Sequence, residues 1–141
     1  MRELRGAQAM IIFAGTNDPW DGASAIISRI DKMLEYNGNN NAIIVSQWSD
    51  DRLTLSQMLE LELAMLKRYG ARFFNLRQYA VKYAMADAGF TPSAGDATRM
   101  ANGLIPLVLT IDSLHPTAKM YELMAIQFKK LLIQTGLIKG F

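Results

Sequence analysis

The stretch Met10-Ile11-Ile12-Phe13-Ala14-Gly15-Thr16-Asn17-Asp18 decides the fold class of this chain. It opens with an unbroken apolar run that ends at a glycine, which is typical of a strand covered on both faces in a parallel sheet. Apolar residues then recur at helical spacing over 24–36, where Ser24 is the predicted N-cap and Gly38 the stop signal. A buried strand that leads into an amphipathic helix predicts an α/β domain.

Strand and helix patterns continue to alternate through the middle of the chain. The predicted elements are strands at 42–45 and 72–76 and helices at 54–69 and 78–88. Thr54 is the predicted N-cap of the longer helix. The residues of that helix expected to face the core are Leu55, Met58, Leu59, Leu66 and Tyr69.

The C-terminal part is expected to carry substrate contacts. Residues 90–106 are predicted to be mostly loop, and long irregular segments of this kind often carry function. The apolar run 107–111 leads to Asp112, and Pro116 is predicted to open the last helix. Alternating strands and helices, without an internal repeat or a linker, predict a single layered α/β domain with a parallel sheet over residues 1–141.

Composition excludes several classes of function. The 15 basic and 13 acidic residues form no run of like charge, so the clustered basic face that binds nucleic acid is not expected. The chain has no cysteine, which excludes a disulfide, a thiolate nucleophile and a cysteine-ligated metal. No apolar stretch approaches the ~18 residues of a membrane span. We expect no metal and no cofactor, and the composition leaves the cellular compartment open.

Polar residues follow the first strand, at the sheet edge where reactive groups gather in open parallel sheets. Gly15 allows a tight turn, and the side-chain amide of Asn17 can stabilise a developing oxyanion. Thr16 and Asp18 flank it next to the expected substrate position, with Asp18 anchoring the turn. The same residue types are common turn formers, so this tetrapeptide alone indicates either a simple turn or an oxyanion hole.

A second polar cluster, Asp112-Ser113-Leu114-His115-Pro116, precedes the last helix. His115 is the only histidine, so any histidine-based acid or base chemistry must use it. Asp112 lies three residues earlier, where its carboxylate can accept the imidazole Nδ1–H and leave Nε2 to take a proton from a nucleophile. The alternative is that Asp112 or His115 only caps the last helix.

Taken together, the two clusters match a known family. A strand ending in Gly-x-Asn-Asp, two further strand–helix units, the element Gly103-Leu104-Ile105-Pro106 and Asp-x-x-His-Pro before a terminal helix resemble the SGNH (GDSL-like) hydrolases in order and spacing. Residues 11–17 look like the third block of that family and 112–115 like its fifth. The resemblance covers nearly the whole chain and implies a three-layer α/β/α fold. Its parallel sheet would be flavodoxin-like, with the first strands missing from this chain.

The resemblance also implies residue roles. Asn17 would be the side-chain member of the oxyanion hole, His115 the general base and Asp112 its orienting carboxylate. Members of the family hydrolyse esters through a covalent acyl-serine, and many remove acetyl groups from carbohydrates. An ester, in particular an acetylated glycan, is therefore the implied substrate, and an extracellular or virion-associated setting the implied location.

The nucleophile of the family has no counterpart in this pattern. It lies in a Gly-Asp-Ser motif that precedes the Gly-x-Asn-Asp strand, and too few residues precede Met10 to hold it. Ser46 and Ser49 follow a strand but lack the flanking glycines of an exposed nucleophile, and the segment 95–97 (Gly-Asp-Ala) has alanine in the serine position. We therefore expect a complementary chain or an N-terminal segment to supply the serine. That segment would also cover an unpaired sheet edge.

Two other interpretations stay open at the level of sequence. A non-catalytic structural or glycan-binding module would keep the same fold, because fold does not dictate function. A flavodoxin-like phosphate-binding domain is disfavoured, since the carboxylate of Asp18 would repel a phosphate bound after the first strand.

Overall fold

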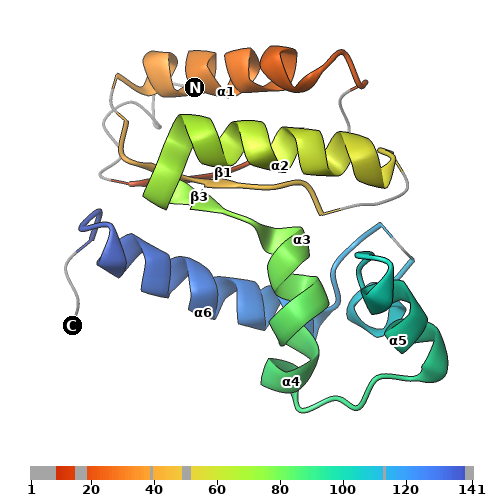
Figure 1. Ribbon diagram of the computed structural model, residues 1–141. Helices are drawn as coiled ribbons and strands as arrows, with labels where there is room; N and C mark the ends of the chain where they lie inside the picture. The colour runs from red at the N-terminus through yellow and green to blue at the C-terminus, as the bar shows by residue number, and fades with distance from the viewer. Residues whose placement is uncertain (1–8, 15–18, 39, 49–51, 113, 139–141) are drawn as a thin grey trace.

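A computed structural model describes residues 9–14, 19–38, 40–48, 52–112 and 114–138 of the 141-residue chain (Figure 1). Its centre is a sheet of three parallel strands in the order β1 (Met10–Phe13), β2 (Ala42–Val45) and β3 (Phe73–Phe74). The register places Ile11 beside Ile43 and Ile44 beside Phe73. The predicted parallel α/β organisation is confirmed.

Helices cover both faces of the sheet. The helices α1 (Ala23–Asn37) and α2 (Leu55–Tyr69) lie on one side, and α6 (Ala118–Gln134) lies on the other (Figure 1). When three parallel strands lie side by side in chain order, right-handed crossovers place both connecting helices on the same face. The two connecting helices here, α1 and α2, lie on one face. All four residues of β2 are buried because this central strand is packed from both sides.

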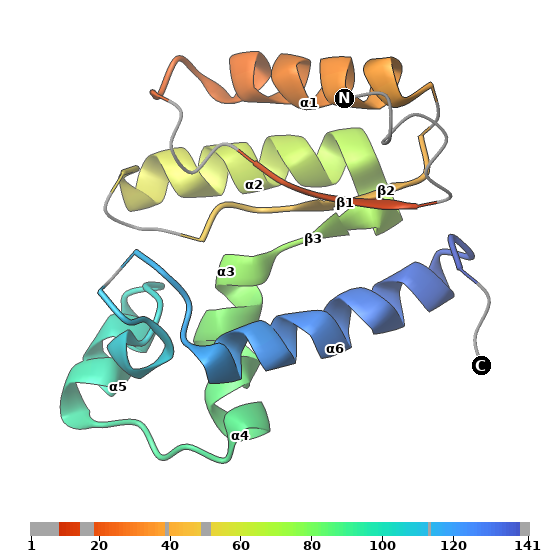
Figure 2. The same ribbon diagram turned by 180° about the vertical axis from the view of Figure 1, so that it is seen from behind.

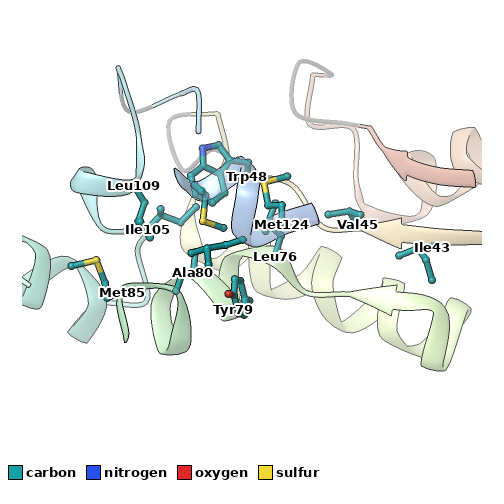
Figure 3. Close-up of a cluster of buried hydrophobic side chains, with 13 residues drawn as sticks. Ile43, Val45, Trp48, Leu76, Tyr79, Ala80, Met85, Ile105, Leu109 and Met124 are labelled. Atoms are coloured by element: carbon teal, nitrogen blue, oxygen red, sulfur yellow. The ribbon is translucent and has the colours of Figure 1, made fainter. Parts of the chain in front are cut away.

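Each face has its own apolar core. On the α1 and α2 side, buried aliphatic side chains of the helices pack on the sheet; they include Ile12, Ile26, Ile30, Ile44, Leu61 and Met65. On the α6 side, the core combines side chains of β2, of α6 and of the helical segment after β3, and it includes Trp48 (Figure 3). Its largest fully buried side chains are Ile43, Trp48, Leu76, Ile105, Leu109 and Met120.

The third strand is shorter than predicted, and the helix after it starts earlier. A 3-10 turn, Gly70–Arg72, precedes β3, and α3 (Leu76–Tyr79) begins immediately after Asn75. The reason is a local cap, because Oδ1 of Asn75 accepts a hydrogen bond from the N–H of Gln78. A π-helical turn, Ala80–Ala84, and α4 (Met85–Ala88) continue the helix to its predicted end.

The inward face of α2 differs from the predicted one. Thr54 caps this helix through a capping box with Gln57, as predicted for its N-cap. Met58 and Tyr69 are buried as expected, but Leu55, Leu59 and Leu66 are exposed. The buried residues of α2 are Met58, Leu61, Glu62, Met65 and Tyr69. The leucine-rich sequence offers more than one apolar face, and packing against β2 and α1 selects between them.

Two predicted helix starts are also wrong. Helix α1 begins after Gly22, and Ser24 lies inside its first turn without acting as the N-cap. Helix α6 begins at Ala118, where Thr117 accepts a hydrogen bond from the N–H of Met120. Pro116 is therefore not the first residue of the helix; it forms an antiparallel bridge with Thr110.

The segment 90–106 is more ordered than a loop. It contains the helix α5 (Ala94–Ala101). The apolar run after this segment begins with a 3-10 turn, Leu107–Leu109. A capping box between Ser93 and Asp96 explains the helix, because it satisfies two backbone N–H groups that would otherwise be unpaired. The sequence Gly-Asp-Ala at 95–97 thus lies in the first turn of α5, and its aspartate is a capping residue.

Candidate active site

Asp112 and His115 lie on a tight loop between the 3-10 turn Leu107–Leu109 and helix α6. Backbone hydrogen bonds close this loop on both sides of the bridge between Thr110 and Pro116. The N–H of Ile111 donates to the carbonyl of His115 at 2.8 Å, and the N–H of Thr117 donates to that of Leu109 at 2.9 Å. The short span between the bridge residues forces the two ends of the Asp-x-x-His segment together.

Asp112 and His115 form a hydrogen-bonded pair. Oδ2 of Asp112 lies 2.8 Å from Nδ1 of His115. The second carboxylate oxygen, Oδ1, accepts hydrogen bonds from the N–H groups of His115 at 2.8 Å and of Leu114 at 3.1 Å. The carboxylate is therefore held on both oxygens, and the predicted pairing of these two residues is present in the structure.

The environment of Asp112 favours its charged form. The hydrogen bond from the His115 ring, followed by the one from the His115 backbone N–H, lowers the pKa of Asp112 to about 2. Near neutral pH the carboxylate is ionised, so it accepts the Nδ1–H and selects the neutral imidazole tautomer that carries its lone pair on Nε2.

The imidazole is accessible to a reaction partner. The side chain of His115 is 61% exposed and that of Asp112 is 52% exposed. Among the described residues, His115 has no side-chain hydrogen bond other than the one to Asp112. An oriented imidazole with an available Nε2 can act as a general base for a hydroxyl nucleophile and then return the proton as a general acid.

Buried residues beneath the loop hold it in place. Leu109 and Pro116 are buried under the two ends of the loop. The carboxylate of Asp96 supports the turn before Leu109, because its Oδ1 accepts a hydrogen bond from the N–H of Val108 at 3.3 Å. Arg99 of the same helix donates from Nε to the carbonyl of Ile105 at 2.8 Å. Helix α5 is thus a platform for the Asp112 and His115 loop.

The sequence pattern did not identify Asp96 as a residue that holds the turn before Leu109. Its other oxygen, Oδ2, accepts a hydrogen bond from the Ser93 hydroxyl at 2.7 Å. This hydrogen bond is the main cause that lowers the pKa of Asp96, and the N–H of Val108 adds to it against the opposing effect of burial. The spacing Ser-x-x-Asp before a helical segment was the available signal, since it resembles a capping box.

Ser46, one of the two serines placed best by the sequence, is not an exposed nucleophile. It is 1% exposed, and its Oγ accepts hydrogen bonds from the N–H of Leu76 at 2.8 Å and from the N–H of Arg77 at 3.4 Å. It therefore ties the end of β2 to the start of α3. Ser49 lies outside the described residues. No serine in the described ranges hydrogen-bonds to the imidazole of His115.

The expected oxyanion cluster, Gly15, Thr16, Asn17 and Asp18, lies outside the described residues. The strand that leads to it, β1, is present as predicted and is described through Ala14. Ser113, between the two members of the pair, is also outside the described ranges.

Other classes of site find no support in the described part of the chain. No group of three or more histidine, aspartate or glutamate side chains there is arranged to hold a metal ion. Nor does that part contain a helix with the length and apolar character needed to cross a membrane. Comparisons of the chain with protein-family models, with curated proteins and with solved structures give no match.

Proposed function

We propose that this chain is part of an ester hydrolase of the SGNH type, in which His115 and Asp112 complete a Ser-His-Asp triad. The serine comes from a polypeptide segment other than the described part of this chain, and acetylated carbohydrates are the proposed substrates. The proposal includes a flavodoxin-like sheet of the SGNH type, of which β1, β2 and β3 would be neighbouring strands.

One observation carries this proposal. The 2.8 Å hydrogen bond between Nδ1 of His115 and Oδ2 of Asp112 is built on a carboxylate that two backbone N–H groups also hold. A helix cap needs only the backbone contacts, and α6 already has its own cap in Thr117. The ring contact is therefore unnecessary for starting the helix, and it is the contact that a general base requires.

In the proposed reaction, the serine hydroxyl gives its proton to Nε2 of His115 while its oxygen bonds to the carbonyl carbon of the ester. Asp112 stays ionised and stabilises the imidazolium that forms. The carbonyl oxygen takes up the negative charge, and the side-chain amide of Asn17 is proposed to donate a hydrogen bond to it.

The second half of the reaction returns the proton. The bond from the carbonyl carbon to the alcohol oxygen breaks, and His115 protonates the departing alcohol. Water then attacks the acyl-serine with His115 as base, and the serine regains its proton as the carboxylic acid leaves.

Activity measurements with p-nitrophenyl acetate and acetylated xylan test this proposal. The chain is assayed alone and together with serine-bearing polypeptides that are encoded next to it. Each assay compares the wild type, the His115→Ala variant and a control variant, Lys130→Ala, on the exposed side of α6. We expect turnover only in the presence of a serine-bearing partner. The His115→Ala change should reduce it by about 10²-fold or more, and the control change should leave it unaltered.

Two results would contradict the proposal. Turnover that survives the His115→Ala change would remove the role of the imidazole. An absence of turnover with every partner, accompanied by binding of acetylated xylan in a sedimentation assay, would instead identify a non-catalytic glycan-binding module.

A further inference from the structure

The strand β1 forms one edge of the sheet in the described part of the chain. The N–H of Met10 donates to the carbonyl of Asn41 at 2.8 Å, so the backbone groups of Met10 point toward β2. Because these directions alternate along a strand, Ile12 also points toward β2, whereas Ile11 and Phe13 present their N–H and C=O groups to the open edge. Figure 2 shows the molecule from the side of β1.

Apolar side chains flank this edge. Ile11 is 43% exposed and Phe13 is 39% exposed, on the face opposite to the buried Ile12. On the other face, α1 overhangs β1 and contributes Met33 and Tyr36, both exposed. The space between β1 and α1 is a cavity of about 670 Å³, large enough for side chains of a docked segment.

A buried polar group also lines this cavity without a partner. Asn37, the last residue of α1, is only 6% exposed, and neither Oδ1 nor Nδ2 of its side chain has a hydrogen-bond partner among the described residues. A buried amide of this kind costs free energy unless a donor and an acceptor reach it.

The charge of the cavity indicates the kind of occupant. Among the described residues, Lys32 is the only charged one that lines it. No salt bridge in the same ranges includes its ammonium group. A second copy paired edge to edge about a two-fold axis would bring both Lys32 side chains to the same face beside the joint, where like charges repel. A different chain with an acidic residue is electrostatically complementary.

From these contacts we infer that the open edge of β1 binds an extended segment of another polypeptide as a fourth strand. The segment is apolar, carries a carboxylate that pairs with Lys32, and hydrogen-bonds to the outward backbone groups of Ile11 and Phe13. This inference does not depend on the proposed esterase activity, because it rests on the sheet edge and α1 alone.

Binding of synthetic peptides tests the inference. One probe is a short labelled peptide rich in valine and threonine that carries one glutamate, and the other has lysine in place of that glutamate. Fluorescence anisotropy measures their affinity for the full chain, and amide hydrogen exchange of Ile11 and Phe13 reports the site. We expect the glutamate peptide to bind several-fold more tightly than the lysine peptide and to slow exchange at both amides.

Variants at the edge of β1 distinguish backbone pairing from nonspecific binding of the peptides. Ile11→Pro removes one outward N–H, and proline is tolerated where the N–H of an edge strand faces away from the sheet. It should abolish binding, whereas Ile11→Val, which keeps the N–H and the β-branched side chain, should preserve it. Lys32→Gln should erase the difference in affinity between the two peptides. Because this change leaves β1 intact, it still tests the inference if the Ile11→Pro variant does not fold.

Three outcomes would overturn the inference. These are the lack of binding by either peptide, equal binding by wild type and a folded Ile11→Pro variant, and a dimer in sedimentation equilibrium that Ile11→Pro dissociates. The last result would assign the edge to a second copy of this chain.

Discussion

Arg77 and Glu62 form a bidentate ion pair in the interior. Nε of Arg77 lies 2.5 Å from Oε1 of Glu62, and Nη2 lies 2.7 Å from Oε2. Both side chains are buried. Nη1 of Arg77 also donates to the carbonyl of Gly103 at 2.6 Å, and Asn75 donates to Glu62 at 2.8 Å. This network joins α2, the start of α3 and the segment before the 3-10 turn at Leu107–Leu109. It therefore fixes the sheet relative to the part of the chain that carries His115.

Breaking this pair should strongly destabilise the fold. Arg77→Met leaves the carboxylate of Glu62 buried without a cation, and we expect the free energy of unfolding to fall by about 3–5 kcal/mol. Urea unfolding followed by circular dichroism measures the change. The control is Arg29→Met, which removes a surface pair with Asp21 and should cost about 1 kcal/mol or less. Equal losses of unfolding free energy in the two variants would show that the buried ion pair contributes no more to stability than the surface pair.

The pair of Asp112 and His115 should respond to acid in a defined range. The pKa of Asp112 is lowered to about 2, from about 4 in an unfolded chain, so its contribution to loop stability is complete above about pH 4. That contribution is lost as the pH falls through about 2. Carbon-detected NMR of the Asp112 carboxyl should show this titration, together with shifts of the Leu114 and His115 amides. A midpoint near 4 would mean that the ring contact is not maintained in solution.

The orientation of the imidazole should depend on the carboxylate. In Asp112→Asn, the side chain no longer provides a charged acceptor for Nδ1–H, so the neutral ring should shift toward the tautomer protonated at Nε2. Nitrogen NMR of His115 reads this directly, since the chain has a single histidine. A tautomer ratio that is unchanged by the substitution would argue against an orienting role for Asp112.

Asp96 should hold the loop of Asp112 and His115 in place through α5. Asp96→Ala keeps the N-cap Ser93 but removes the carboxylate that accepts hydrogen bonds from Ser93 and from the N–H of Val108. We expect a loss of about 1–3 kcal/mol in unfolding free energy. The amide signals of residues 107–115 should shift as well. Thr98→Ala on the exposed part of the same helix is the matched control. Shifts confined to α5 would show that the loop does not need Asp96.

The packing beneath the loop gives a further test. Leu109 is fully buried in the core on the α6 side, whereas its neighbour Val108 is 44% exposed. Leu109→Ala should cost about 2–5 kcal/mol because it leaves a cavity, and Val108→Ala should cost much less. Thermal unfolding of both variants measures the difference. Similar effects at the two positions would be inconsistent with the core described for this region.

The sequence by itself determined the features that depend on short-range chemistry. Strands at β1 and β2 were predictable because their apolar runs have no polar face to expose to solvent. The predicted cover on both faces is present only for β2, because β1 lies at an edge of the described sheet and exposes Ile11 and Phe13. The capping box of Thr54 and the contact between Asp112 and His115 each lie within three residues, so local turn geometry brings their groups together. The class of fold and the candidate catalytic pair therefore followed from the chain alone.

Only the tertiary structure decided the features that depend on which elements pack together. It selected the buried face of α2, where Leu61 and Met65 are inside and Leu59 and Leu66 are outside. It paired Glu62 with Arg77 across fifteen residues, and it assigned Ser46 to a buried structural role. The physical reason is that burial is a property of contacts between distant segments, and a charged or polar side chain is placed inside only where a partner from another element meets it.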